Sequence, residues 1–300
     1  MSLRREEFLG LTREVRGNAM SDAEFDWLFE RGPLEGIVSL AEDEGCVTGV
    51  LAMTLARAIV DGHETRVAFS VHGTTHPAAR GRGVFSRLEL QNEERAAEQG
   101  ATIALAFAGG ATSSIFARLG WQDLYRARIW ARPLRPFRAL RRRGGGGLPP
   151  ARGSTLERFT EAHEHAWRTE QPLWGSCLAR DAEYLNWRYV ESPTEYRLLA
   201  SGNGYAVLTH VVRRGISTAA VCDLVGSPSE QRALLGRCLH DVRGGADVVI
   251  GIPAPDQRRA FAGRGFVTTP KALRVMGKAL QPGVSLPTRW HFALGDTDFF

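Results

Sequence analysis

Pro77-Ala-Ala-Arg80-Gly81-Arg82-Gly83-Val84-Phe85-Ser86 is the stretch that decides the fold of this chain. Residues 65–76 before it place large apolar side chains at every second position, which predicts a strand, and residues 84–99 predict a helix. Glycine lets the backbone turn tightly and approach a ligand closely. The first amides of a helix have no partner within it, and residues 77–85 contain no Ser, Thr, Asp or Asn to cap them. The stretch therefore predicts a strand, a tight turn and a helix that begins with bare amides.

Positive charge surrounds this turn. Arg80, Arg82 and Arg87 lie in it or just after it, and the helix dipole adds a partial positive charge. Bare amides and positive charge together suit the oxygens of a pyrophosphate. The turn is not a Gly-x-Gly-x-x-Gly fingerprint and has no Lys-Ser/Thr pair, so neither a dinucleotide fold nor an ATPase is favoured. An ordinary strand–helix turn is the alternative interpretation.

The surrounding sequence predicts further helices and strands. Ser21 and Glu24 form a capping-box pattern at the start of one helix. Apolar periodicity predicts helices over 4–16, 21–29 and 113–119, and strands over 36–42, 46–57, 102–107 and 121–131. This order predicts an α/β fold, of the α+β kind with a mixed sheet flanked by helices.

The pattern occurs twice along the chain. Trp27-Leu-Phe-Glu-Arg-Gly-Pro33 resembles Trp187-Arg-Tyr-Val-Glu-Ser-Pro193, and Phe116-Ala-Arg-Leu-Gly-Trp121 resembles Phe261-Ala-Gly-Arg-Gly-Phe266. Two landmarks in the same order indicate a tandem repeat. Two unrelated helix–turn motifs are the alternative, because both landmarks are short.

The second copy begins its corresponding helix differently. Ser227-Pro228-Ser229-Glu230 has Ser at the cap, Pro at the first position and Glu three residues after the cap. These residues make a capping box, whose side chains occupy the amides that a phosphate would need. We therefore expect a degenerate second copy that binds no such ligand.

These patterns divide the chain into four parts. We predict a first module over 1–131, a basic linker rich in Gly and Pro over 132–153, a degenerate second module over 154–280 and a tail over 281–300. The arginines of the linker could contact nucleic acid, but only Phe137 interleaves with them, so we interpret this run as solvated.

Composition limits the class of protein. A net charge of +5 and a pI near 9.3 favour anionic partners, including a CoA ester or a membrane surface. The four cysteines have no CxxC pair or metal-ligand spacing, which indicates a reducing compartment and no metal site. No apolar run approaches the roughly 20 residues of a spanning helix, and the N-terminus is charged. We expect a cytoplasmic protein that binds neither membrane nor nucleic acid.

The sequence resembles the GNAT superfamily of acyl-CoA-dependent N-acyltransferases. That family has an Arg/Gln-x-x-Gly-x-Gly/Ala loop, which corresponds to the segment Arg80–Phe85, where Phe85 replaces the usual small residue. It also has an aromatic-x-x-x-Gly-aromatic segment about 30 residues later, which corresponds to Phe116–Trp121. The resemblance covers residues 20–131 well and residues 155–280 as a degenerate copy. It implies two tandem GNAT-like modules.

The resemblance also implies a cosubstrate, acetyl-CoA, and its binding residues. Pantetheine would pair with the backbone at Thr74 and Thr75, and the amide near Thr75 would stabilise the oxyanion. An amine would attack the thioester directly within a ternary complex. The pyrophosphate would lie on the loop formed by Arg80, Gly81, Arg82, Gly83, Val84 and Phe85.

Two residues are candidates for proton transfer. His72 lies where the family often places a carboxylate base on the strand, and imidazole suits that role. Asp296 in the tail would bind an amine or act as base if the tail folds over the substrate. The tyrosine that commonly acts as general acid in the family is replaced by Phe116. Either water or another group then protonates the thiolate, or the reaction proceeds without an acid. Packed or solvated roles for His72 and Asp296 are the alternatives.

The predicted activity is acetyl transfer to a primary amine of a small molecule, such as an amino sugar or a natural-product amine. A non-catalytic acyl-CoA-binding sensor is one alternative, which the missing Tyr supports. A tRNA-dependent aminoacyl transfer enzyme is another, since it shares the tandem arrangement. The sequence leaves the amine, the acyl chain and the oligomeric state open.

Overall fold

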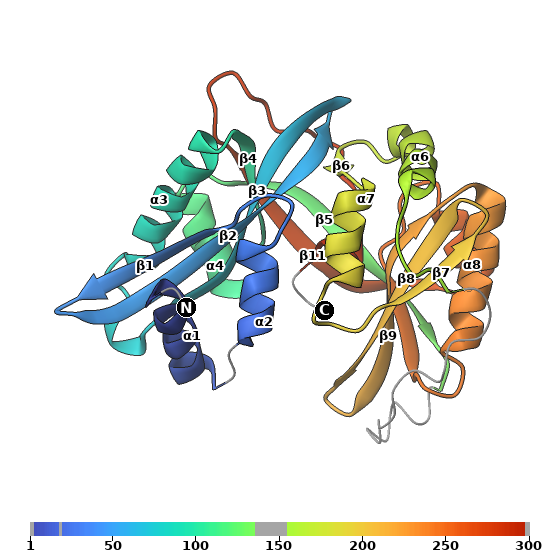
Figure 1. The fold of residues 1–300 in the computed structure, drawn as a ribbon, viewed down its shortest axis with the longest axis horizontal. Helices are drawn as coiled ribbons and strands as arrows, with labels where there is room; N and C mark the ends of the chain where they lie inside the picture. Colours follow the sequence, from blue (N-terminus) through green and yellow to red (C-terminus); the bar gives the residue numbers. More distant parts are fainter. Residues whose placement is uncertain (1–2, 18–19, 136–154, 298–300) are drawn as a thin grey trace. The chain divides into compact units, whose positions relative to one another are not determined.

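The computed structural model describes residues 3–17, 20–135 and 155–297 (Figure 1). Contacts between Cα atoms divide the chain into two compact units, each built from two segments. Unit 1 comprises Met1–Tyr125 and Arg274–Thr288, and unit 2 comprises Arg126–Leu273 and Arg289–Phe300. Most of the predicted linker, residues 136–153, lies outside the described residues.

Unit 1 contains the helices and strands that the periodicity predicts. Its helices are α1 (Leu3–Arg16), α2 (Asp22–Phe25), which continues as the π-helix η1 (Asp26–Glu30), the 3₁₀ turn η2 (Pro77–Ala79), α3 (Val84–Glu98) and α4 (Gly110–Arg118). Its strands are β1 (Ile37–Asp43), β2 (Cys46–Val60), β3 (His63–Thr75), β4 (Ala101–Phe107) and the first part of β5 (Gln122–Pro133). The predicted capping box of Ser21 and Glu24 is confirmed.

The helices of unit 1 cover both faces of its sheet. β1, β2 and β3 are antiparallel neighbours, and β4 is parallel to β3. Val50 and Ala52 of β2 pack with the phenylalanines of α1 and α2, whereas Leu51 between them packs with Val84 and Leu88 of α3. Because strand side chains alternate, α1 and α2 lie on one face and α3 on the other (Figure 1).

Unit 2 repeats this order of elements. Its helices are α6 (Glu161–Glu170), the 3₁₀ turn η3 (Gln171–Leu173), α7 (Ala182–Leu185), which continues as the π-helix η4 (Asn186–Val190), α8 (Pro228–Asp241), α9 (Arg258–Gly263) and the 3₁₀ turn η5 (Leu294–Asp296). Its strands are β6 (Cys177–Leu178), β7 (Arg197–Ser201), β8 (Gly204–Arg213), β9 (Ile216–Val225), β10 (Val248–Gly251) and the first part of β11 (Val267–Ala279).

The structure confirms both landmarks of the repeat. α2 and α7 each have four residues and each run into a five-residue π-helix. The rings of Phe116 and Trp121 lie 4.4 Å apart between centroids, and those of Phe261 and Phe266 lie 4.7 Å apart. In each pair the later residue donates its backbone N–H to the carbonyl of the earlier phenylalanine, at 3.0 and 3.1 Å.

The two copies exchange their last strands. In unit 1, Ile103–Phe107 of β4 pair with Val275–Ala279 of β11, which the second copy encodes. In unit 2, Val248–Gly251 of β10 pair with Trp130–Pro133 of β5, which the first copy encodes. The compact units therefore differ from the modules predicted at 1–131 and 154–280. Sequence landmarks locate the copies, but they carry no information about which strand lies beside which.

No helix in the described ranges combines the length and the apolar composition that crossing a membrane requires.

Candidate functional site

Strands β3 and β4 of unit 1 separate towards their C-terminal ends. Among the described residues, the parallel pairing begins with Arg66 opposite Ala101 and ends with Phe69 opposite Leu105. β3 continues to Thr75 and keeps its antiparallel pairing with β2 on the other edge. The last residues of β3 therefore present one backbone edge that β4 does not pair.

A β-bulge in β3 marks the place where the strands separate. Leu51 of β2 lies opposite two residues, His72 and Gly73, and His72 has a φ of +53°. Arg16 donates to the carbonyl of Gly73, and Nδ2 of Asn92 donates to the carbonyl of Leu51 at 3.3 Å. The bulge turns His72 towards η1, where its ring lies edge-on to Phe29 with 6.1 Å between centroids.

The turn after β3 leaves the start of α3 without a cap. Gly81 and Gly83 have φ values of +79° and +75°, which suit glycine, and Gly83 is the N-cap residue of α3. No described side chain accepts a hydrogen bond from the amides at this cap. A Cβ added at either glycine would meet no protein atom within 4 Å. The turn is thus uncapped, and the space around its two glycines is open.

Two glycines on the strands make room for the bulky residues that begin α3. A Cβ at Gly49 would lie 2.4 Å from Val84, and a Cβ at Gly73 would lie 2.8 Å from the ring of Phe85. Phe85 also packs edge-on against Phe116, with 5.7 Å between centroids. The two departures from the GNAT pattern, Phe85 and Phe116, therefore contact each other and form one apolar wall.

The arginines Arg80 and Arg82 of the turn are exposed, whereas the ring of His76 contacts neighbouring groups through both nitrogens. Arg80 is exposed, and Arg82 makes a solvent-exposed 3.4 Å contact with Asp43, which contributes little stability. His76 accepts the Ala78 amide at Nδ1, and its Nε2 lies 3.3 Å from Glu14. These contacts give His76 a structural role.

Sequence reasoning missed a polar cluster on the buried face of α3. The Ser70 hydroxyl donates to Glu89 at 2.7 Å, while Glu93 accepts from the Trp121 indole at 2.7 Å and from Lys278 at 2.5 Å. Burial raises the pKa of Glu89 to about 8, against the hydrogen bond from Ser70, which lowers it. Two glutamates four residues apart, on the helix face that carries the apolar residues, were the available signal.

The corresponding turn of unit 2 is closed, as the sequence predicts. The Ser227 hydroxyl accepts from the Glu230 amide, and the Glu230 carboxylate accepts from the Ser227 amide at 2.8 Å. Glu230 also accepts from the amides of Asn203 and Gly204. These hydrogen bonds outweigh partial burial and lower the pKa of Glu230. The protein's own side chains thus occupy the amides that stay bare in unit 1.

Asp296 lies in unit 2, inside a buried ion-pair network. Both of its oxygens accept from Arg180, at 2.9 and 2.8 Å, and the Arg180 guanidinium also contacts Asp223 at 3.2 Å. The side chain of Asp296 is fully buried, and one oxygen also accepts from the Ala293 amide. This arrangement exposes no oxygen to a substrate, so we assign Asp296 a structural role in place of the predicted catalytic one.

The tail segment that carries Asp296 packs against β9. The carbonyl of Cys222, at the bulge of β9, lies 3.0 Å from the Cβ position of Gly295, and Arg188 donates to the Gly295 carbonyl at 2.8 Å. Trp290, His291 and Phe292 of the same segment are buried. The segment therefore fills, on β9, the position that corresponds to the bulge of β3.

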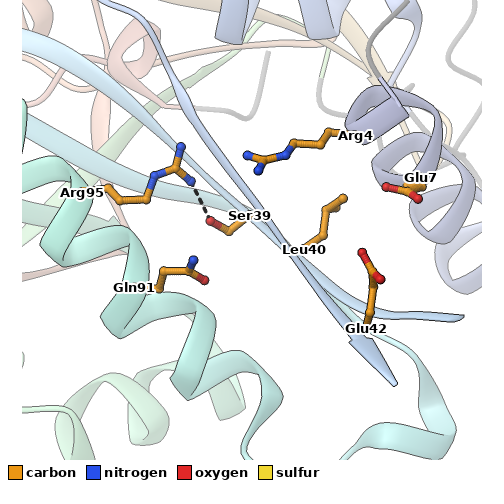
Figure 2. Close-up of a pocket in the computed structure, with 7 residues that line it drawn as sticks. All are labelled: Arg4, Glu7, Ser39, Leu40, Glu42, Gln91 and Arg95. Carbon is orange, nitrogen blue, oxygen red and sulfur yellow. Dashed lines mark hydrogen bonds between the residues drawn. The ribbon is translucent and has the colours of Figure 1, made fainter. Parts of the chain in front are cut away.

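A hollow of about 440 Å³ lies at the outer edge of β1, between α1 and α3 (Figure 2). Arg4 and Glu7 reach it from α1, and Arg95 reaches it from α3 and donates to the Ser39 hydroxyl at 2.9 Å. Its lining mixes both signs of charge and includes none of the predicted site residues. Over the described part of the chain, no three His, Cys, Asp or Glu side chains group as metal ligands would.

Residues 4–123 match the family model described as an acetyltransferase (GNAT) domain. This part of the chain, which contains the open turn, the bulge and the separated strands, is therefore a GNAT acetyltransferase domain. Its fold supports an acyl-transfer function.

Solved structures share this fold over nearly the whole chain. Eis1 from Mycobacterium abscessus is 19% identical with a TM-score of 0.62, covering 93% of this chain and 73% of that one. A GCN5-related N-acetyltransferase from Anabaena variabilis is 14% identical with a TM-score of 0.66, covering 94% and 71%. One from Kribbella flavida is 17% identical with a TM-score of 0.65, covering 92% and 70%. A search by sequence among curated proteins gives no match.

Proposed function

We propose that unit 1 transfers an acyl group from acetyl-CoA to a primary amine of a small molecule, within a ternary complex. The observation that carries this proposal is the uncapped helix start at Gly83, open to solvent and lined by a second left-handed glycine. The amides that follow Gly83 would hold the CoA pyrophosphate, with Arg80 and Arg82 adding positive charge.

The edge of β3 from which β4 has separated supports the position proposed for pantetheine. The His76 amide donates to Thr48 of β2, so by strand alternation the Thr75 amide points to the opposite edge. That is the edge from which β4 has separated. Pantetheine would pair there beside Thr74 and Thr75, and the Thr75 amide would stabilise the oxyanion of the tetrahedral intermediate.

The chemistry of transfer follows from these positions. The amine nitrogen forms a bond to the thioester carbonyl carbon, the carbon–sulfur bond breaks, and CoA leaves as the thiolate. His72, at the bulge, would accept the proton that the amine loses. Phe116 has no hydroxyl and packs in the core, so water would protonate the thiolate.

Unit 2 would bind no cosubstrate, for two independent reasons. Ser227 and Glu230 already occupy its helix start. The tail segment around Gly295 fills the position on β9. We therefore propose one acyl-CoA site per chain.

Thermal unfolding with and without acetyl-CoA tests where the cosubstrate binds. A ligand at a hundred times its Kd stabilises the native state by about 2.7 kcal/mol, so Tm should rise by several degrees. In Gly83→Val the rise should disappear, because a side chain would project into the space meant for phosphate. Gly62→Val is the matched control: Gly62 has a φ of +85° and open space around it, but it lies in the β2–β3 hairpin. If Gly83→Val keeps the full rise in Tm, the turn is not the binding site.

Thiol release measured with a panel of primary amines then tests the reaction. Release that depends on the amine supports the enzyme. A rise in Tm without release from any amine supports the sensor alternative. Absence of a Tm rise, together with transfer from an aminoacyl-tRNA, supports the third alternative and overturns the proposal.

A further inference from the structure

A second hollow, of about 480 Å³, lies in unit 2 and is lined by positive charge. It is bounded by the end of β5, the C-terminal end of α8 and the turn between α9 and β11. Its ionisable lining residues are Arg132, Arg135, His240, Arg243 and Arg264, and no Asp or Glu lines it. We call these five residues the basic hollow.

Gly236 makes room for one arginine of the basic hollow. A Cβ at Gly236 would lie 2.8 Å from Nη2 of Arg264. Gly244 and Gly265 lie beside Arg135 and Arg132, where added Cβ atoms would make ordinary contacts at 3.6 and 3.8 Å. Gly236 stands inside α8, where glycine costs about 1 kcal/mol relative to alanine. The guanidinium that lies against it gives a reason for this unfavourable residue.

Neutral groups hold two of these arginines in place. Arg132 donates to the carbonyl of Arg264, and Arg264 donates to the carbonyl of Arg232 at 2.8 Å. Carbonyl groups orient a guanidinium without neutralising it. The C-terminal end of α8 contributes about half a negative charge, against four guanidinium groups. The basic hollow therefore keeps a net positive charge that a bound anion would offset.

We propose that the basic hollow binds a small molecule that carries two or more phosphate groups, such as a nucleoside polyphosphate. A guanidinium matches phosphate oxygens with two parallel hydrogen bonds, and several such groups converge here. The volume lies within the range of about 300–1,000 Å³ that small-molecule sites have. The hollow belongs to unit 2, so the proposal does not depend on acyl transfer by unit 1.

Calorimetric titration of the full-length chain with pyrophosphate and with ATP tests this proposal. The Gly83→Val background removes any contribution from the turn before α3. We expect one site per chain whose affinity falls with salt. Arg243→Glu combined with Arg264→Glu should weaken binding about tenfold or more, because each charge-assisted contact contributes a factor of about ten. Gly236→Val should also weaken binding, since it displaces the Arg264 guanidinium.

The matched control is Arg214→Glu combined with Arg259→Glu, which makes the same change in net charge on exposed residues of unit 2 outside the hollow. Equal affinities in the two double variants would overturn the proposal, as would the absence of binding. Arg243→Glu alone, at an exposed residue, keeps the test valid if the double variant misfolds. An RNA oligomer that binds through these arginines, with no binding of pyrophosphate or ATP, would overturn the assignment to a small molecule.

Discussion

At the scale of single residues, a small residue on β3 compensates for a bulky one on α3, so this chain departs from the GNAT pattern and still keeps the turn open. Phe85 is bulky where a small residue is usual, and Gly73 of β3 provides the space for its ring. The same ring packs against Phe116, which replaces the usual Tyr. A hydroxyl at position 116 would be buried within this apolar wall and would need a partner there. The absence of a hydroxyl at position 116 and the bulky side chain at position 85 are therefore linked, because the two rings pack against each other.

His72 is the residue on which proton transfer is expected to depend. His72→Asn keeps a residue that tolerates a positive φ, so the bulge should persist while the base is lost. A general base contributes a factor of about 10² to 10⁴, so kcat should fall by about a hundredfold with KM for acetyl-CoA unchanged. Steady-state rates across pH measure both quantities. A kcat within twofold of the parent chain would show that His72 is not the base.

At the scale of elements, α3 combines an uncapped N-terminus with an inner face that carries buried polar side chains. Its N-terminus is left bare, and its inner face carries Glu89, Asn92 and Glu93 into the sheet. Glu93 has two partners, whereas Glu89 has only Ser70, and one of its oxygens has no hydrogen-bond partner within the described residues. Burial of this carboxyl group favours its neutral form.

Stability should therefore depend on pH through Glu89. Its folded pKa of about 8 lies above the unfolded value near 4.5, so the folded state holds a proton that the unfolded state has lost. The contribution of Glu89 to stability is greatest below the unfolded pKa and falls between pH 4.5 and 8, by up to about 1.4 kcal/mol per pH unit. Glu89→Gln should remove this part of the slope, as urea unfolding at pH 5.5 and 8 would measure. Glu94→Gln, at an exposed position of α3, should leave the slope unchanged.

Helices and strands of unit 1 were predictable because periodicity and caps are local properties of the sequence. The capping boxes at Ser21 and Ser227 and the bare start at Gly83 were read from adjacent residues. The bulge at His72, the burial of Glu89 and the ion pair of Asp296 depend on strand register and on distant partners. Arg132 illustrates the limit: it belongs to a basic run that we interpreted as a solvated linker, yet it lies in β5 against Gly265.

At the scale of the whole molecule, the exchange of last strands makes each compact unit depend on both copies of the repeat. Unit 1 needs Val275–Ala279 to pair with β4, and Lys278 of that segment pairs with Glu93 of α3. Gly277 fits tightly, because a Cβ there would lie 2.3 Å from Leu124. A boundary drawn between the copies would separate β4 from β11 and β10 from β5.

Residues 1–133 alone should consequently be much less stable than the full chain. This fragment would expose the edge of β4 and leave Glu93 without Lys278. A peptide of residues 267–288, added in trans, should restore a cooperative thermal transition followed by circular dichroism. The same peptide with Gly277→Val should fail, because of its clash with Leu124. Cooperative unfolding of the fragment alone, near the Tm of the full chain, would contradict this expectation.

The exchanged strand also bears on how such a chain can change over generations. A duplicated copy that performs no chemistry is ordinarily free to decay or to be deleted. Here the copy with the closed helix start supplies the strand that pairs with β4 in the unit that holds the open turn. Whatever selects for the fold of the first copy therefore also acts on the segment Val275–Ala279 of the second, because β4 pairs with that segment.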